Sequence, residues 1–282
     1  MTYRLQALAL RVLLAVLRPL PYAVRVEGVG RVVRTLAALV PSLRARAERN
    51  LALVYPGWPE AERRRVALAA AANAGRALAM IWFARDARAA LSSLRAEGEG
   101  LDALRDAQAE GRPAILVTGH FGPFEAMRHA LRNEGIEVGG LYRPNNNPHY
   151  DPIFVAGLEE TGRPVLPRGR AGLRGMIAHL RAGGVFEILA DQAMEDGPAL
   201  PFLGHPAHTS LATAELALRH GAPLLPAFAV EGADGLRVIV EAPIPPSDAA
   251  TMMAEFNRRL GSRVRADPSQ WYWFHRRWKT YG

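Results

Sequence analysis

Residues 113–125 read PAILVTGHFGPFE. The first part is apolar and rich in β-branched side chains, which predicts a buried strand over residues 113–118. A Gly-Pro pair then interrupts the strand, and a proline suits the first turn of a helix, here predicted over residues 124–133. The pattern therefore predicts that His120 lies on the loop leaving a strand and Glu125 in the first turn of the following helix.

The two ionisable side chains of this segment are five residues apart. On one continuous helix that spacing would separate them by about 140°. The Gly-Pro turn lets the chain fold back, so the Glu125 carboxylate is expected to contact one imidazole nitrogen of His120. The other nitrogen would face the substrate, which makes a neutral imidazole a general base for a hydroxyl. A structural histidine is the alternative interpretation.

Beyond this segment, strand-like and helical stretches alternate along the second part of the chain. Candidate strands cover residues 113–118, 136–142, 185–190, 223–230 and 236–241. Candidate helices cover residues 124–133, 151–161, 171–182, 210–220 and 249–266. Such alternation predicts an α/β fold with a mixed, largely parallel central sheet flanked by helices.

The first part of the chain has a different character. No stretch before residue 111 has the pattern of a strand, whereas residues 28–40, 42–53 and 60–83 look helical. The sequence therefore predicts a helical N-terminal region over residues 1–110. An α/β core with a basic, aromatic C-terminal tail follows over residues 111–282.

The N-terminal segment of residues 5–17 is almost wholly apolar. Arg4, Arg11 and Arg18 recur every seven residues, so they line one helix face with about 20° of drift per step. A helix of this length spans about 20 Å, less than the roughly 30 Å hydrocarbon core of a bilayer. The pattern predicts a helix over about residues 4–18 lying in a membrane interface. A core helix is an alternative; a signal peptide is disfavoured by the internal arginine and the missing cleavage site.

Composition limits the chemistry. The 282 residues contain no cysteine, which excludes disulfides, thiolate metal sites and a cysteine nucleophile. The net charge of +8 is concentrated at the ends, with nine arginines in residues 1–50 and six, plus Lys279, in residues 258–282. This distribution predicts a surface for anions such as lipid headgroups, phosphorylated sugars, nucleic acid or an acidic carrier protein. An arginine-rich composition alone is the alternative, since Lys279 is the only lysine.

Polar side chains follow other predicted strands. Arg143 comes after the strand over residues 136–142 and suits a phosphate or carbonyl oxygen. Arg170 precedes a helix and could also reach an anion, while Asp191 ends the strand over residues 185–190 and could hold substrate hydroxyls or an arginine. Because the carboxyl ends of parallel strands form ligand sites, we expect these side chains at one sheet edge. Loop contacts, solvation and helix capping are the structural alternatives.

Two further motifs have competing interpretations. His205 and His208 have a spacing that can bind metal, but Pro206 predicts a turn and no third ligand is marked, so we expect no metal site. Residues 271–279 combine five large aromatic side chains with three cations. Such a segment suits a membrane interface, stacking on nucleic-acid bases, or docking on the domain through cation–π pairs.

Taken in order, these blocks resemble the bacterial lipid A late acyltransferases (lauroyl/myristoyl acyltransferases), within the lysophospholipid acyltransferase superfamily. The blocks that carry the resemblance are Arg49-Asn50-Leu51, Gly119-His120 through Glu125, Tyr142-Arg143-Pro144 with Asn147-Pro148, Arg170 before Leu173-Arg174-Gly175-Met176-Ile177, Asp191-Gln192, Pro201-Phe202-Leu203-Gly204, Gly221-Ala222-Pro223 and Trp273 through Lys279. The chain departs from the family at Pro123-Phe124, where Asn-Trp is commoner, and at Ala193-Met194, where many relatives are more acidic or contain histidine.

The resemblance implies transfer of a fatty acyl group from acyl carrier protein or acyl-CoA to a hydroxyl of a membrane glycolipid, a lipid A precursor. It also implies a peripheral or monotopic position on the cytoplasmic face of the inner membrane, no cofactor or metal, and no nucleic-acid partner. Another lipid acceptor, such as a phosphatidylinositol mannoside, a lysophospholipid or an amino-acid lipid, is the alternative.

The resemblance also assigns site residues. The family's His-x-x-x-x-Asp/Glu pair falls on His120 and Glu125 as the catalytic residues. Its basic substrate-binding positions fall on Arg143 and Arg170, and we expect Asp191 and Gly122 to contribute to substrate binding as well.

Overall fold

A computed structural model describes residues 2–194 and 197–278 of the chain. Its core is a seven-stranded sheet in the order β1-β9-β8-β2-β5-β3-β4, with a separate hairpin of β6 and β7. The strands are β1 (Ala96–Glu97), β2 (Ala114–Thr118), β3 (Val138–Tyr142), β4 (Val165–Pro167), β5 (Val185–Leu189), β6 (Ala199–Phe202), β7 (His205–His208), β8 (Leu224–Gly232) and β9 (Gly235–Val240). Every neighbouring pair in the large sheet is parallel except β8 and β9, so the predicted mixed, largely parallel sheet is confirmed.

Helices cover both faces of this sheet or lie beside it. They are α1 (Thr2–Leu17), α2 (Tyr22–Leu39), α3 (Pro41–Val54), α4 (Glu60–Trp82), α5 (Ala84–Ala90), α6 (Gly100–Ala109), α7 (Ala126–Arg132), α8 (Asp151–Thr161), α9 (Arg170–Arg181), α10 (Ala212–His220) and α11 (Ala249–Ala266). All side chains of β2 are buried, so this strand needs helices on both faces of the sheet. Ile115 and Val117 pack in a cluster with α10 and α11, whereas Ala114 and Leu116 pack with α6 and α7.

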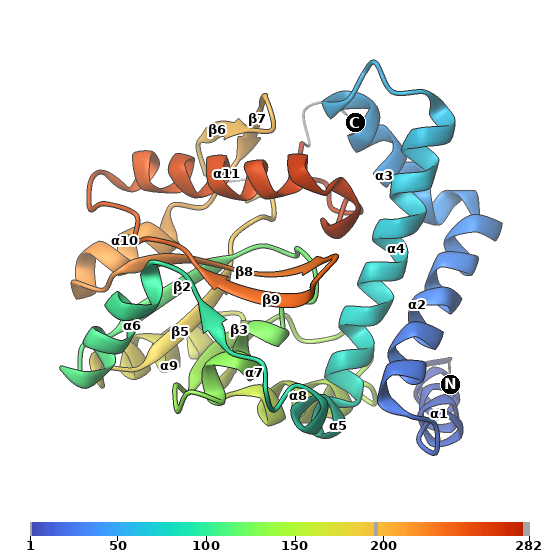
Figure 1. Cartoon of the computed structure of the whole chain (residues 1–282), viewed down its shortest axis with the longest axis horizontal. Coiled ribbons are helices and arrows are strands. Elements are labelled where there is room, and N and C mark those ends of the chain that lie inside the picture. Colours follow the sequence, from blue (N-terminus) through green and yellow to red (C-terminus); the bar gives the residue numbers. More distant parts are fainter. Residues whose placement is uncertain (1, 195–196, 279–282) are drawn as a thin grey trace.

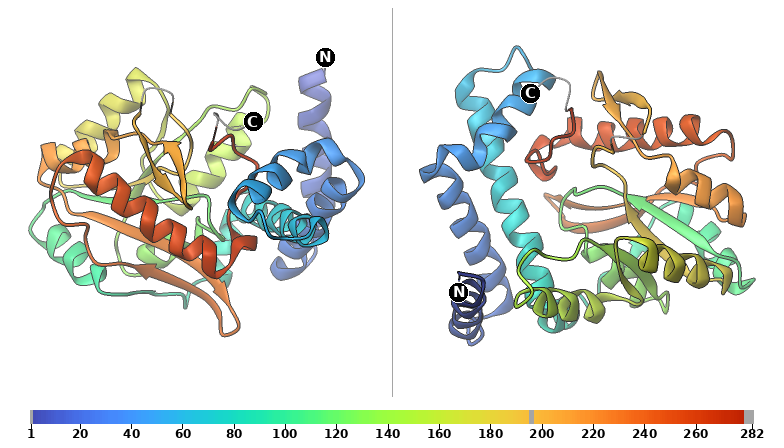
Figure 2. Two further views of the ribbon diagram at one scale, coloured as in Figure 1. Left: turned by 90° about the horizontal axis from the view of Figure 1, so that it is seen from above. Right: turned by 180° about the vertical axis from the view of Figure 1, so that it is seen from behind.

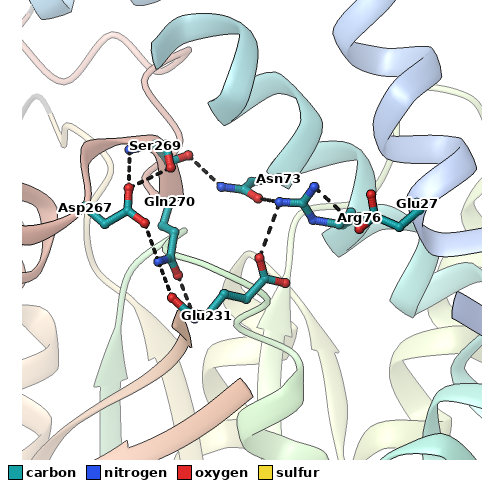
Figure 3. Close-up of polar contacts among 7 residues, drawn as sticks. All are labelled: Glu27, Asn73, Arg76, Glu231, Asp267, Ser269 and Gln270. Carbon is teal, nitrogen blue, oxygen red and sulfur yellow. Dashed lines mark hydrogen bonds and ion pairs between the residues drawn. The ribbon is translucent and has the colours of Figure 1, made fainter. Parts of the chain in front are cut away.

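The predicted N-terminal helices form, and they lie together on one side of the sheet (Figures 1 and 2). Helices α2 and α4 approach closely where Gly30 meets Gly75. A polar network joins this region to the core (Figure 3). Asn73 of α4 donates to the Ser269 carbonyl at 2.7 Å, and Arg76 pairs with Glu231 of β8 at 3.3 Å. These contacts fix the helical region beside the edge of the sheet at which β2 ends.

Four short strands were not expected. Strand β1 lies before residue 111, where no strand was predicted, and it pairs in parallel with β9. Strand β4 has only three residues, and β6 and β7 each contain a proline. His205 and His208 therefore lie on a hairpin strand rather than in a turn. Such short or proline-containing segments offer too few residues for a period-two pattern.

The aromatic C-terminal segment is part of the core. Trp271, Trp273 and Trp278 are buried, and the Arg277 guanidinium stacks over the Phe202 ring at 5.2 Å. The interpretation as a segment docked through cation–π contacts is therefore confirmed, and these three tryptophans pack inside the protein rather than against a membrane. Lys279 lies outside the described residues.

The N-terminal helices expose a broad apolar surface. The exposed apolar side chains of α1 include Leu5, Leu8, Val12, Leu13 and Val16. Those of α2, the α2–α3 corner and α3 include Val24, Val32, Leu36, Leu39, Val40 and Leu43. Among the described helices, none is by itself long and apolar enough to cross a membrane; α4 and α5 together reach the required length and composition, with a 97° bend between them.

Candidate active site

Two neighbouring strands bring a histidine and a carboxylate to one edge of the sheet. Strands β2 and β5 run in parallel with Thr118 opposite Leu189. His120 and Asp191 each follow two residues later, so they leave the sheet at the same level. Their side chains meet there, with His120 Nδ1 2.8 Å from Asp191 Oδ1.

Asp191 is surrounded by donors. Its Oδ2 accepts from the His120 backbone N–H at 2.8 Å and from the Trp271 indole N–H at 2.9 Å. Burial by itself would raise the pKa of Asp191, but the adjacent His120 imidazole outweighs it and holds the pKa well below its usual value. An ionised carboxylate can only accept, so the His120 ring donates through Nδ1–H, and in its neutral form it has its lone pair on Nε2.

A second imidazole faces the Nε2 side of His120. The ring of His275 lies 4.9 Å from that of His120, and the Gln192 amide nitrogen lies between them, 3.2 Å from His275 Nε2 and 3.5 Å from His120 Nε2. Burial, with a contribution from His120, lowers the pKa of His275 to about 4, so the second ring is neutral near pH 7. The Gln192 NH₂ group thus lies within hydrogen-bond distance of the Nε2 atoms of both imidazoles.

The backbone of the histidine loop is held firmly. Gly122 has φ +56, and a Cβ there would overlap the Ala229 carbonyl oxygen. Its N–H donates to the Gln270 carbonyl at 2.8 Å, while the Tyr272 N–H donates to the His120 carbonyl at 3.0 Å. The loop therefore needs glycine at this position, and the C-terminal segment fixes its shape.

The predicted contact between Glu125 and the imidazole is not formed. Glu125 is buried, and its Oε2 accepts from the Thr161 hydroxyl at 3.1 Å and from Arg128 at 3.4 Å. Arg128 lies three residues along, on the same side of α7, and its buried guanidinium also donates to the carbonyls of Val138 and Gly162. The expected geometry is therefore corrected: Asp191 occupies the position beside Nδ1, and Glu125 instead joins the start of α7 to Thr161 of α8.

His120 opens onto a cavity of about 930 Å³ between the helical region and the sheet. One wall is the alanine-rich face of α4, with Ala70, Ala71, Ala74 and Ala77. The remaining lining comes from α2, α3, the histidine loop, Phe154 of α8 and the C-terminal segment, and includes Leu36, Leu43, Arg46, Arg49, Gly122, Phe124, Tyr272, Phe274 and His275. An imidazole in the wall of a mainly apolar cavity suits a substrate that combines a hydroxyl with a hydrocarbon chain.

Sequence comparisons agree with this chemistry. The model of the family described as "Bacterial lipid A biosynthesis acyltransferase" matches residues 2–280. The chain belongs to this family. Relatives include a lipid A biosynthesis lauroyltransferase of Escherichia coli (strain K12), 33% identical over 82% of this chain and 78% of the relative. A palmitoleoyltransferase of the same strain is 28% identical over 83% and 78%, and a lipid A biosynthesis acyltransferase of Haemophilus influenzae is 29% identical over 83% and 76%.

A solved structure is also similar. The crystal structure of a 1-acyl-sn-glycerophosphate acyltransferase from Thermotoga maritima aligns with 87% of this chain and 97% of its own, at 14% identity and a TM-score of 0.37. Membership of the lipid A acyltransferase family makes acyl transfer the reaction class of this protein, and the resemblance seen in its motifs is confirmed.

Of the other residues predicted for the site of this acyltransferase, two lie at the site and two lie away from it. Gly122 lines the cavity, and Asp191 lies directly behind the histidine. Arg143 and Arg170 are exposed, and neither belongs to the described residues that line the cavity. Arg143 contacts Asn146 at 3.4 Å, within its own loop. No group of three His, Asp or Glu side chains in the described part of the chain is arranged to hold a metal ion.

Sequence reasoning missed two residues of the site. Gln192 had been noted only as part of the Asp191-Gln192 block, and His275 only as part of the aromatic segment. Gln192 directly follows Asp191 at the end of a predicted strand, and this position could have indicated that it belongs to the site. His275 reaches the site through the fold of the C-terminal segment, which no local pattern indicates.

Proposed function

We propose that this acyltransferase moves a fatty acyl chain from a thioester donor, acyl carrier protein or acyl-CoA, to a hydroxyl of a membrane glycolipid, a lipid A precursor. The observation that carries the proposal is the His120 imidazole, held through Nδ1 by Asp191 and facing an apolar cavity with Nε2. The family relationship supports both acyl transfer and a lipid A acceptor.

In the proposed reaction His120 Nε2 removes the proton of the acceptor hydroxyl while its oxygen attacks the thioester carbonyl carbon. Asp191 stabilises the imidazolium that forms, as an ionised carboxylate beside a cation. The carbon–sulfur bond then breaks, an ester remains, and the imidazolium returns its proton to the leaving thiolate. The Gln192 amide nitrogen lies 3.5 Å from Nε2, and in the proposed reaction it turns toward the oxyanion once the acceptor hydroxyl takes its place at Nε2. Glu125 contributes by positioning α7 rather than by touching the imidazole.

The apolar surface of the N-terminal helices supports membrane association. Leu36 and Leu43 are 49% and 52% exposed and also line the cavity, so the cavity opens beside this surface. Arg4 and Arg11 on α1, and Arg18 directly after it, are exposed and can reach lipid phosphates. We propose that lipid chains enter the cavity from the bilayer, and that the membrane is the inner membrane at its cytoplasmic face, as the family resemblance implies.

The test is transfer of a labelled acyl group from acyl carrier protein and from acyl-CoA to a lipid A precursor in mixed micelles. His120→Ala should lower kcat by about 10²–10⁴-fold, because it removes the general base. His149→Ala, an imidazole outside the cavity lining, is the matched control and should keep wild-type turnover. Near-normal turnover by correctly folded His120→Ala would refute the mechanism, and transfer only to a different lipid would refute the acceptor.

A further inference from the structure

We propose that Arg46 and Arg49 of α3 form a phosphate-binding pair that holds a phosphorylated substrate beside His120. This inference rests on the proposed function and adds a binding site to it. The two arginines replace Arg143 and Arg170, the positions expected from the sequence, as the cations of the cavity.

Their position is the first argument. Arg46 and Arg49 are three residues apart on α3, so both side chains project from one helix face. Both line the cavity that His120 and His275 also line. Arg46 is half-buried and Arg49 is exposed, so the pair extends from the interior of the cavity to its rim.

The second argument is that Arg46 and Arg49 have no acidic partner among the described residues. Within residues 2–194 and 197–278, neither guanidinium takes part in an ion pair. Arg46 makes one long hydrogen bond, 3.3 Å to the Phe274 carbonyl. Arg44, on the same helix, is different: it pairs with Glu48 at 2.8 Å and donates to the carbonyls of Ala37 and Ala38 at 3.0 Å. The fold therefore satisfies Arg44 and leaves Arg46 and Arg49 available.

The chemistry of the ligand follows from the residue type. The half-buried Arg46 attracts an anion more strongly than it would in water, and the exposed Arg49 adds a second positive charge beside it. Their planar donor forks match the oxygens of phosphate. Phosphate has two sources in the proposed reaction: the sugar headgroup of the acceptor and the pantetheine arm of the donor. Either would sit at the rim while the hydrocarbon chain fills the alanine-lined interior.

The experiment compares acceptors with and without the phosphate in wild type, Arg46→Ala, Arg49→Ala and the two lysine variants. We expect each alanine variant to raise KM for the phosphate-bearing substrate about 10- to 100-fold, the range for a charge-assisted contact. Lysine should restore part of the loss. Arg64→Ala, an exposed arginine of α4 outside the cavity, is the control and should behave as wild type.

The arms distinguish the two phosphates. If the arginine pair binds the acceptor phosphate, the alanine variants and wild type should have the same KM for the dephosphorylated acceptor, because that acceptor has no phosphate for the arginines to bind. If the donor phosphate is bound, KM for the thioester rises and the loss is equal for both acceptors. Equal kcat loss on both acceptors with an unchanged donor KM would overturn the proposal, since it would indicate a structural role.

A binding measurement separates this inference from the proposed function. Binding of the phosphorylated and dephosphorylated acceptors, and of acyl carrier protein thioester and acyl-CoA, is measured in the His120→Ala background, where turnover is stopped. Arg46→Ala and Arg49→Ala are each added to His120→Ala. If either double variant binds one phosphate-bearing ligand more weakly than His120→Ala alone, the site is supported even if transfer to that acceptor fails. Unchanged binding of every ligand would refute the arginine pair while leaving His120 catalysis intact.

Discussion

The Asn50 side chain of α3 holds the backbone beside His275. Its amide donates to the His275 carbonyl at 2.8 Å and to the Trp273 carbonyl at 2.7 Å, across more than two hundred residues of sequence. A residue of the N-terminal helical region thus fixes the segment that brings the second imidazole to the site.

Replacing Asn50 tests this connection. Asn50→Asp keeps the size of the side chain but removes both donors, and it places a carboxylate against two carbonyl oxygens. We expect a loss of about 1–3 kcal/mol in the free energy of unfolding, measured in urea, together with a lower kcat. A variant with unchanged kcat and stability would show that the C-terminal segment needs no such support.

Asp191→Asn should switch the tautomer of His120. Because Asp191 Oδ2 accepts two N–H groups, the single amide oxygen of asparagine would take that position and its NH₂ would face Nδ1. The ring must then accept at Nδ1 and carry its proton on Nε2, where no base remains. We expect kcat to fall about 10²–10⁴-fold with little change in KM, and nitrogen NMR of the imidazole to report the Nε2–H form. An Nδ1–H ring with wild-type turnover would contradict the assignment.

Glu187→Gln should change the pH dependence of stability. Burial raises the pKa of Glu187 to about 8, Glu125 adds to the shift and Arg128 opposes it. Because this pKa is raised on folding, the folded protein keeps a proton that the unfolded chain releases, and stability falls as the pH rises from about 4.5 to 8. Glutamine cannot ionise, so the variant should not show this loss. Between pH 5.5 and pH 8, its free energy of unfolding should rise by about 2–3 kcal/mol relative to that of wild type. Urea unfolding at both pH values measures it.

The exposed Glu215→Gln of α10 provides the control for that comparison. It should follow wild type at both pH values. A parallel response of Glu187→Gln and wild type would mean that Glu187 is ionised throughout the range.

Gly122→Ala should damage the histidine loop. The backbone has φ +56 at this position, and the added methyl group meets the Ala229 carbonyl. We expect destabilisation of about 1–3 kcal/mol by urea unfolding and a reduced kcat, because His120 is displaced. Gly57→Ala, where open space surrounds the Cβ position, is the control. Equal stability of both variants would show that the loop adapts.

Charge on the exposed face of α1 should weaken membrane binding. Leu8→Asp and Val16→Asp each place a carboxylate among exposed apolar side chains. Co-sedimentation with vesicles containing anionic lipid should fall at least about tenfold, while the fold is retained because both positions are exposed. Leu218→Asp, at an exposed apolar position on α10, should bind as wild type. Unchanged sedimentation of the α1 variants would remove this surface from the proposed membrane contact.

Much of the fold could be predicted because long elements carry strong patterns. The buried run of β2 and the apolar period of α11 were recognised from sequence, with the latter spanning the predicted residues. Two-residue β1 has no pattern, and its pairing with β9 depends on the finished sheet.

The site was predictable only in part. His120 follows from its strand, but its partner was assigned to Glu125, which is close in sequence. The contact with Asp191 depends on β2 and β5 being neighbours, a tertiary fact that links residues 71 positions apart. Similarly, tryptophans beside arginines suit a membrane interface and a protein core alike, and only packing shows that Trp271 and Arg277 belong to the core.

The alanine face of α4 has a consequence for how this enzyme can diversify. The methyl groups that border the cavity belong to a different segment from the loops that carry the base and its carboxylate. Bulkier residues on that helix would shorten the space for a hydrocarbon tail and leave the proton-transfer geometry untouched. In the proposed reaction, substitutions on α4 can therefore alter the length of chain that the cavity accepts without replacing any group that transfers a proton.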